Sequence, residues 1–167
     1  MEGAANKPAN DAFSVALGLE SLVPLIGARD KAEAVGVARE IEAEQRRVFA
    51  SLPPEDDNHM YEALALCVQG NAELAAGDRA ESGRTFDQAV AIANRAIRVP
   101  APLIVSAYTI AKVTQGIRAD RLARGNCSEA RDWWRKEVEL WRGLAPKSEY
   151  AALRMAQAEK DAPACGQ

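Results

Sequence analysis

The positions of apolar residues along this chain predict helices almost throughout. Apolar side chains recur every three or four residues, which is the spacing of one face of an α-helix. The pattern predicts three helix pairs and one final helix, over residues 11–27 and 30–51, 58–76 and 79–98, 102–124 and 128–142, and 147–161. Proline-containing segments separate the pairs, and they mark boundaries because proline inside a helix costs about 3 kcal/mol. Pro24 lies inside the first predicted helix and predicts a kink or an end there.

One short pattern recurs every 48 residues and marks the turn inside each pair. Residues 77–82 (GDRAES) match residues 125–130 (GNCSEA), and the same step backwards reaches residues 29–34 (RDKAEA). Each copy has an Asp or Asn followed three residues later by Glu, as at a helix N-cap with an acidic residue in the first turn. The sequence therefore predicts three helix–turn–helix units of equal period.

The middle unit resembles a tetratricopeptide repeat. The likeness is carried by Gly70-Asn71-Ala72, Ala76-Gly77-Asp78 and Phe86-Asp87-Gln88-Ala89, by Gly125, Ala130 and Trp134 in the third unit, and by Ala34 in the first. The resemblance implies antiparallel helix pairs stacked into a right-handed superhelix, with longer helices than the family's usual period of about 34 residues allows. Residues 125–134 and Leu140-Trp141 also resemble the C-terminal repeat regions of bacterial Ser/Thr protein kinases, although no kinase motif is present.

The expected fold is thus all-α, with one tetratricopeptide-like domain over residues 11–161. Its units cover about 11–51, 58–98 and 102–142, and the helix at 147–161 caps the array. Residues 1–10 and 162–167 are expected to be flexible ends. Alanine is abundant, with 34 residues, and the close contacts between helices are expected at Ala34, Ala72, Ala89 and Ala130.

The first helices line the inner surface of such arrays, so the resemblance places partner-binding residues there. The matching face carries Leu64, Cys67, Asn71 and Leu74 in the second unit, and Lys112, Gln115 and Ala119 in the third. Family members that hold the terminal carboxylates of a peptide use Lys and Asn at such places, and Asn71 and Lys112 resemble that pattern. A groove of this kind holds an extended peptide or a partner helix. The alternative is that both are ordinary solvated residues.

Two charged residues depart from the repeat pattern in the third unit. Arg118 replaces the residue that is Gly70 in the second unit, and Glu137 borders an apolar arc where the family has a small residue. Their opposite charges predict a compensating ion pair between the two helices. The alternative is that Arg118 binds the carboxylate of a ligand.

Aromatic residues are expected mainly in the core. Phe86 fills the second helix of its unit, and Trp134 and Trp141 are seven residues apart on one helix face. Trp133 lies toward the edge of that face, where it would pack on the last helix or be exposed to a partner.

The three cysteines bear on the cellular compartment. A last helix antiparallel to residues 128–142 would return Cys165 to the neighbourhood of Cys127. A Cys127–Cys165 disulfide would imply an oxidising, periplasmic or extracytoplasmic compartment, whereas two free thiols leave the cytoplasm as the default. Cys67 is expected to be buried and reduced, without a basic neighbour that would activate it.

Composition narrows the function classes further. The net charge of −3 argues against nucleic acid as the partner, and no apolar run reaches the roughly 18 residues that span a membrane. One histidine and three scattered cysteines predict no metal site, and no catalytic or cofactor motif is present. His59, which follows three acidic residues, is interpreted as part of a helix start. Neither an enzyme activity nor a cofactor is predicted.

The sequence therefore predicts a non-catalytic interaction or scaffolding module that binds a protein segment or peptide in the groove of a helical repeat array. The first alternative is a regulatory or sensory region of a bacterial signalling protein. The second is a small helical-bundle enzyme or ligand binder. No oligomeric state is predicted.

Overall fold

The computed structural model of the chain describes residues 15, 18, 20–101 and 104–164. All regular secondary structure in these residues is helical, which confirms the all-α class. The chain divides into two compact units, residues 1–96 and 97–167. One continuous domain over 11–161 stays a prediction, and the expected flexible segment 1–10 lies outside the described residues.

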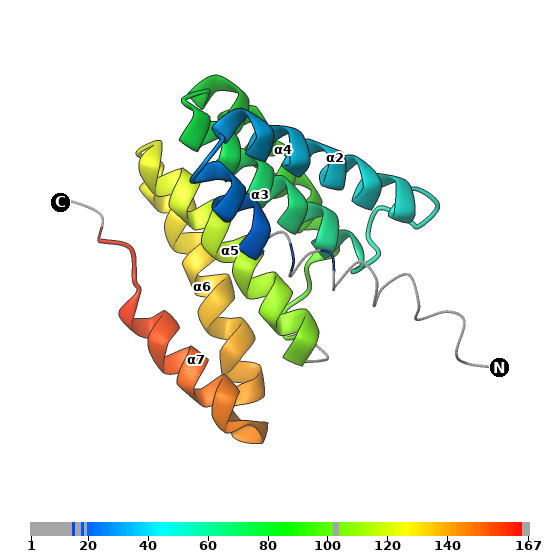
Figure 1. Cartoon of the computed structure of the whole chain (residues 1–167). Coiled ribbons are helices and arrows are strands. Elements are labelled where there is room, and N and C mark those ends of the chain that lie inside the picture. Colours follow the sequence, from blue (N-terminus) through cyan, green and yellow to red (C-terminus); the bar gives the residue numbers. More distant parts are fainter. Residues whose placement is uncertain (1–14, 16–17, 19, 102–103, 165–167) are drawn as a thin grey trace. The chain divides into compact units, whose positions relative to one another are not determined.

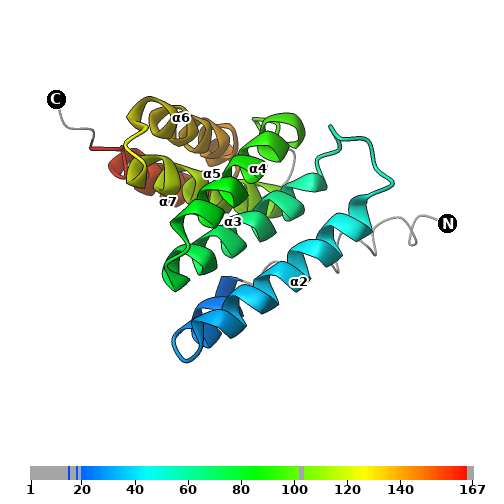
Figure 2. The same ribbon diagram turned by 90° about the horizontal axis from the view of Figure 1, so that it is seen from above.

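The first unit consists of one short helical segment followed by three longer helices. Residues 20–27 are helical and precede α2 (Lys31–Phe49), α3 (His59–Ala76) and α4 (Arg79–Ala96). The helix α2 packs against α3, and α3 packs against α4, as Figure 2 shows. One apolar cluster joins the first helical segment, α2 and α3, and its buried members are Val23, Ala34, Ala38, Ala65, Val68 and Ala72.

The second unit contains α5 (Ile104–Ala123), α6 (Cys127–Leu144), the short 3₁₀ turn η1 (Ala145–Lys147) and α7 (Glu149–Lys160). The helix α6 packs against α5 and against α7, which runs alongside it in Figure 1. Trp141 and Leu140 are fully buried in α6, as are Val113 and Ile117 in α5. The Trp134 Nε1–H group donates to the Ala158 carbonyl at 2.7 Å and thereby ties α7 to α6.

Helix ends agree with the sequence prediction to within two residues wherever both are described. The four alanines expected at close contacts, Ala34, Ala72, Ala89 and Ala130, are all buried. The first helical segment does not end at Pro24, because residues 20–27 are helical throughout. Proline lacks only its own N–H, so its carbonyl still accepts from the Ala28 N–H at 3.0 Å.

The 48-residue pattern forms the same tight turn twice. Gly77 and Gly125 follow α3 and α5 with φ of 96° and 75°, a left-handed conformation that glycine adopts without steric cost. The N–H of the next residue then bonds the carbonyl five residues earlier, Asp78 to Glu73 at 3.0 Å and Asn126 to Arg121 at 2.8 Å. Arg29 occupies the equivalent position before α2 and does not adopt positive φ, so the first turn differs.

The predicted N-caps are confirmed at all three turns. The side chains of Asp30, Asp78 and Asn126 accept from the backbone N–H groups of Glu33, Glu81 and Glu129 respectively. In a full capping box, the glutamate side chain accepts in return from the backbone N–H of the cap residue. Here the N–H groups of the three cap residues are already bonded to carbonyls of the preceding helix, so they do not make this second bond. At the third turn the Asn126 amide instead donates to the Glu129 carboxylate at 2.7 Å.

Candidate functional site

A pocket of about 430 Å³ opens in the first unit between its first helical segment, α2 and α3. We call it the Asn71 pocket. Most of its lining is apolar and small: Val23, Pro24, Gly27, Ala28, Ala34, Val68, Ala72 and Ala75. Glu20, Lys31 and Asn71 supply the polar groups. On α3 the lining residues follow one helical face, because positions 68, 71, 72 and 75 are three or four residues apart.

The groove residues predicted on α3 fall into two groups. Asn71 is exposed and lines the pocket, and Leu74 is 42 % exposed one turn further on. Leu64 and Cys67 are buried, so their side chains do not contribute to an open surface. The prediction was wrong for these two because α3 is buried on all sides from Met60 to Gly70, as expected for a helix that is apolar all round.

The groove residues predicted on α5 lie in the second unit, where each has a different environment. Ala119 is exposed, whereas Lys112 is half-buried with its Nζ 5.4 Å from the centre of the Tyr108 ring. Gln115 uses its Nε2 to donate to Glu137 Oε1 at 2.5 Å. Its amide therefore serves the interior of the second unit.

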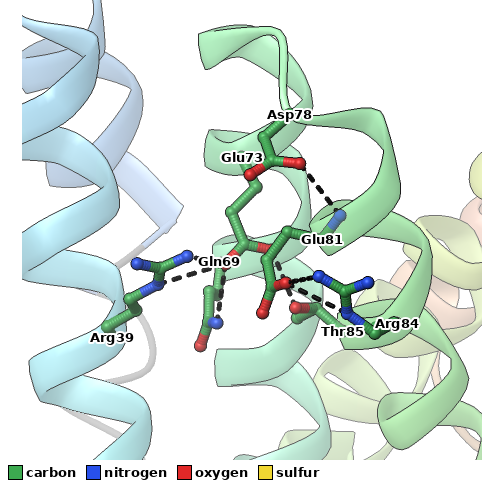
Figure 3. A network of polar contacts seen from close by, with 7 residues as sticks. All are labelled: Arg39, Gln69, Glu73, Asp78, Glu81, Arg84 and Thr85. Atoms are coloured by element: carbon green, nitrogen blue, oxygen red, sulfur yellow. Dashed lines mark hydrogen bonds and ion pairs between the residues drawn. The ribbon is translucent and has the colours of Figure 1, made fainter.

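A buried carboxylate next to the Asn71 pocket joins three helices (Figure 3). Glu73 of α3 is 1 % exposed, and Arg39 of α2 donates to its Oε1 through Nε at 3.2 Å and Nη2 at 2.9 Å. Gln69 donates to the same oxygen at 2.9 Å, and the Thr85 hydroxyl of α4 donates to Oε2 at 2.7 Å. A carboxylate so fully hydrogen-bonded fixes the packing of its helices.

The Glu73 network was not anticipated from the sequence, although a signal was present. Glu73 lies in α3, the most apolar of the described helices, and no basic residue stands three or four positions away on this helix. A helical glutamate without a local partner must find donors on other helices if it is buried. Val68 and Ala72 line the pocket and stand next to Gln69 and Glu73 in sequence, so the network links α2 to α3 beside the pocket.

A second buried carboxylate lies in the second unit. Glu137 of α6 is 2 % exposed and accepts from Gln115 and from Arg118 Nη1, which is 3.2 Å from its Oε2. Burial raises the pKa of the Glu137 carboxyl, while the Gln115 hydrogen bond and the charges of Arg118 and Arg154 act in the opposite direction. The structure thus places Arg118 and Glu137 in the contact expected from their departures from the repeat.

Trp134 differs from the sequence prediction, and the exposed alternative for Trp133 is excluded. Trp141 is buried as expected, but Trp134 is only half-buried and Trp133, expected at an edge, is buried. Lys136 Nζ lies 3.9 Å from the centre of the Trp133 ring, and burial lowers the pKa of this lysine. Trp133 is therefore covered within the molecule and is no exposed anchor.

Of the cysteines, Cys67 is buried and forms no disulfide, as predicted. Cys127 is the first residue of α6 and is disulfide-bonded, whereas Cys165 lies outside the described residues. The pairing Cys127–Cys165 therefore stays a prediction. Intact mass measured with and without reductant tests it, since the bridged chain is lighter by two hydrogens.

The described part of the chain holds no group of three or more His, Cys, Asp or Glu residues arranged to bind a metal ion. Within the same residues, no helix combines the length and apolar character needed to cross a membrane. No family model matches the chain, and neither the curated proteins nor the solved structures contain a match to it.

Proposed function

We propose that the chain is a non-catalytic interaction module of the tetratricopeptide-like type, and that it binds a segment of a partner protein in the Asn71 pocket. The observation that carries the proposal is the pocket itself, an apolar hollow of about 430 Å³ with one exposed amide in its lining. This volume lies within the range of pockets that hold small ligands or a few side chains, about 300–1,000 Å³.

The lining favours an aliphatic segment of a protein. Its small residues leave room for branched side chains, and Asn71 can both donate to and accept from the backbone of an extended chain. The pocket also has one acidic and one basic residue, Glu20 and Lys31, so a partner of strong single-sign charge gains nothing there.

The superhelical arrangement is part of the same proposal. The two glycine turns, equal in geometry and 48 residues apart, support a repeated helix-pair unit. Small-angle X-ray scattering of the whole chain tests the arrangement. An elongated particle supports the array, whereas a compact globule contradicts it.

Peptide selection tests the binding function. A displayed library of random peptides is selected on the whole chain, and the dissociation constants of the selected peptides are measured for variants. Asn71→Ala removes the amide and Ala75→Leu fills the pocket from an exposed position, so each should weaken binding at least about tenfold, or 1.4 kcal/mol. Gln88→Ala, an exposed amide on α4 outside the pocket, is the matched control and should change nothing.

The same peptides also test the residue predicted in the second unit. If Lys112→Ala weakens binding as Asn71→Ala does, the partner segment extends beyond the pocket. Peptides that bind all variants with the affinity of the wild type would contradict the Asn71 pocket as the binding site.

A further inference from the structure

A second pocket of about 240 Å³ lies in the first unit, where α2 and α4 end and α3 begins. We call it the Arg46 pocket. It combines charged and aliphatic lining residues: Arg46, His59, Glu62 and Arg95 on the one hand, Leu52 and Ile92 on the other. It shares no lining residue with the Asn71 pocket, so a ligand of one pocket does not require the other.

His59 is the unusual member of this lining. Its Nδ1 is 2.9 Å from Glu62 Oε2, and because a carboxylate accepts, Nδ1 carries the proton of this contact. The other ring nitrogen, Nε2, is buried and has no hydrogen-bond partner in the part of the chain that the structure describes. A buried ring nitrogen without a partner is costly, and a group that enters the pocket can supply the missing bond.

The guanidinium of Arg46 is oriented by two acidic side chains, Glu42 and Glu62. Its Nε and Nη2 donate to Glu42 Oε1 at 3.0 and 2.6 Å, and its Nε is 3.8 Å from Glu62 Oε1. These contacts use one edge of the guanidinium, and its Nη1 has no partner among the described residues. Glu62 is the acidic residue of the pocket lining, which also contains Arg46 and Arg95.

We propose that the Arg46 pocket binds an aliphatic carboxylate, with the carboxylate between Arg46 and the Nε2 of His59 and the aliphatic part against Leu52 and Ile92. The guanidinium of Arg46 is a good donor to a carboxylate, and the His59 ring donates to it from Nε2 when both ring nitrogens carry a proton. The pocket is smaller than most ligand pockets, about 300–1,000 Å³, so the ligand is one carboxylate with a short side chain. A free short-chain acid and the C-terminal residue of a peptide share this chemistry.

The chain's single histidine makes the test direct, because its one imidazole ring gives unambiguous proton NMR signals. The whole chain is titrated with N-acetyl-leucine, with its neutral amide N-acetyl-leucinamide, and with isovalerate. We expect N-acetyl-leucine to move the His59 signals saturably with a dissociation constant of about 1–10 mM, as suits so small a ligand. The amide should bind at least about tenfold more weakly, because it lacks the charge.

The arms distinguish the two sources of the carboxylate. Tighter binding of N-acetyl-leucine than of isovalerate assigns the pocket to a peptide C-terminus, and the reverse order assigns it to a free short-chain acid. The proposal is overturned if neither acid moves the His59 signals saturably, or if the acid and its amide bind equally well.

A matched pair of variants locates the carboxylate. Arg46→Gln should weaken binding of N-acetyl-leucine at least about tenfold. Arg47→Gln, at the next residue on α2, should not, because Arg47 does not line the pocket and pairs with Glu44. Equal affinity of the two variants would contradict the assignment to Arg46. Should Arg46→Gln unfold the protein, the comparison of acid and amide on the wild-type chain still decides.

Discussion

Positions 70, 86 and 89 in the α3–α4 pair correspond, 48 residues later, to positions 118, 134 and 137 in the α5–α6 pair. In the first set, Gly70 lets the Phe86 ring approach the α3 backbone so closely that a Cβ at position 70 would lie 2.7 Å from the ring. Phe86 is 1 % exposed and Ala89 is fully buried. At these three positions the α3–α4 pair is in contact through packing, without an ion pair.

The second set closes its helix pair by charge. Arg118 fills the place of the glycine, Glu137 fills the place of the alanine, and the two form an ion pair. The aromatic of this set, Trp134, is only half-buried and turns its Nε1–H to the Ala158 carbonyl of α7. Where an arginine replaces the glycine, a buried carboxylate pairs with it, and the aromatic residue of the set makes its hydrogen bond to the following helix, α7.

Truncating the two aromatics gives the largest expected contrast. Phe86→Ala leaves a cavity at a fully buried position and should lower the free energy of unfolding by about 4 kcal/mol. Trp134→Ala should cost about 2 kcal/mol, because the ring is half-exposed and loses one hydrogen bond. Urea unfolding followed by circular dichroism measures both. Equal losses would show that the two pairs are closed in the same way.

Removing the buried carboxylate tests whether charge holds the second pair. Glu137→Ala leaves Arg118 mostly buried without its partner and should cost about 3 kcal/mol, whereas Glu137→Ala combined with Arg118→Leu should recover most of that loss. Tryptophan fluorescence is the suitable probe, since all three tryptophans lie in the second unit. If the melting temperature of Glu137→Ala equals that of the wild type, the Arg118–Glu137 ion pair does not stabilise the second helix pair.

A methyl group at position 70 tests the packing reading of the first pair. Gly70→Ala gains helix propensity but meets the Phe86 ring, so the net loss should be about 1–2 kcal/mol, and Phe86→Leu in the same chain should reduce it. Gly36→Ala on α2 is the control, since nothing lies within 4 Å of a Cβ there. It should stabilise the protein by up to about 1 kcal/mol. If Gly70→Ala leaves the free energy of unfolding unchanged, the close contact between Gly70 and the Phe86 ring is contradicted.

The smallest effect concerns pH. Because the folded-state pKa of Glu137 is raised above its ordinary value of 4.5, its contribution to stability is complete below that value and is lost as the pH rises through the folded-state pKa. The neutral amide of Glu137→Gln has no such loss. The free energy of unfolding of the wild type minus that of Glu137→Gln should therefore fall as the pH increases from about 4 to 8. A difference that rises with pH would contradict the direction.

Local patterns made most of the fold predictable. Helices, turns and caps depend on neighbours within four residues, so periodicity, Gly77, Gly125 and the Asp or Asn caps were sufficient to place them. The pairing of Arg118 with Glu137 could be predicted because both replace small residues of the repeat, and their charges are opposite. The half-exposure of Trp134 was not predictable, since it depends on how α7 packs against α6.

Less of the candidate site followed from the sequence. Asn71 is exposed, as both the groove role and the solvated alternative require, and its role in binding stays a prediction. The choice of Leu64 and Cys67 assumed an open face on a helix that is buried on all sides over its first two-thirds. The Glu73 network joins residues 34 positions apart in sequence, and the Arg46 pocket joins three helix ends. Such long-range contacts leave no periodic trace in a single sequence.

The glycine turns also decide where this chain can change its length. Since the residue after each glycine bonds a carbonyl five residues earlier, one inserted residue at Gly77 or Gly125 would part donor from acceptor and rotate the following helix by about 100°. The connection between α2 and α3 is longer, and its residues from Pro53 to Glu55 are exposed. Natural length variation and an engineered reporter peptide therefore belong at Glu55, where the chain can lengthen without disturbing the register of its repeats.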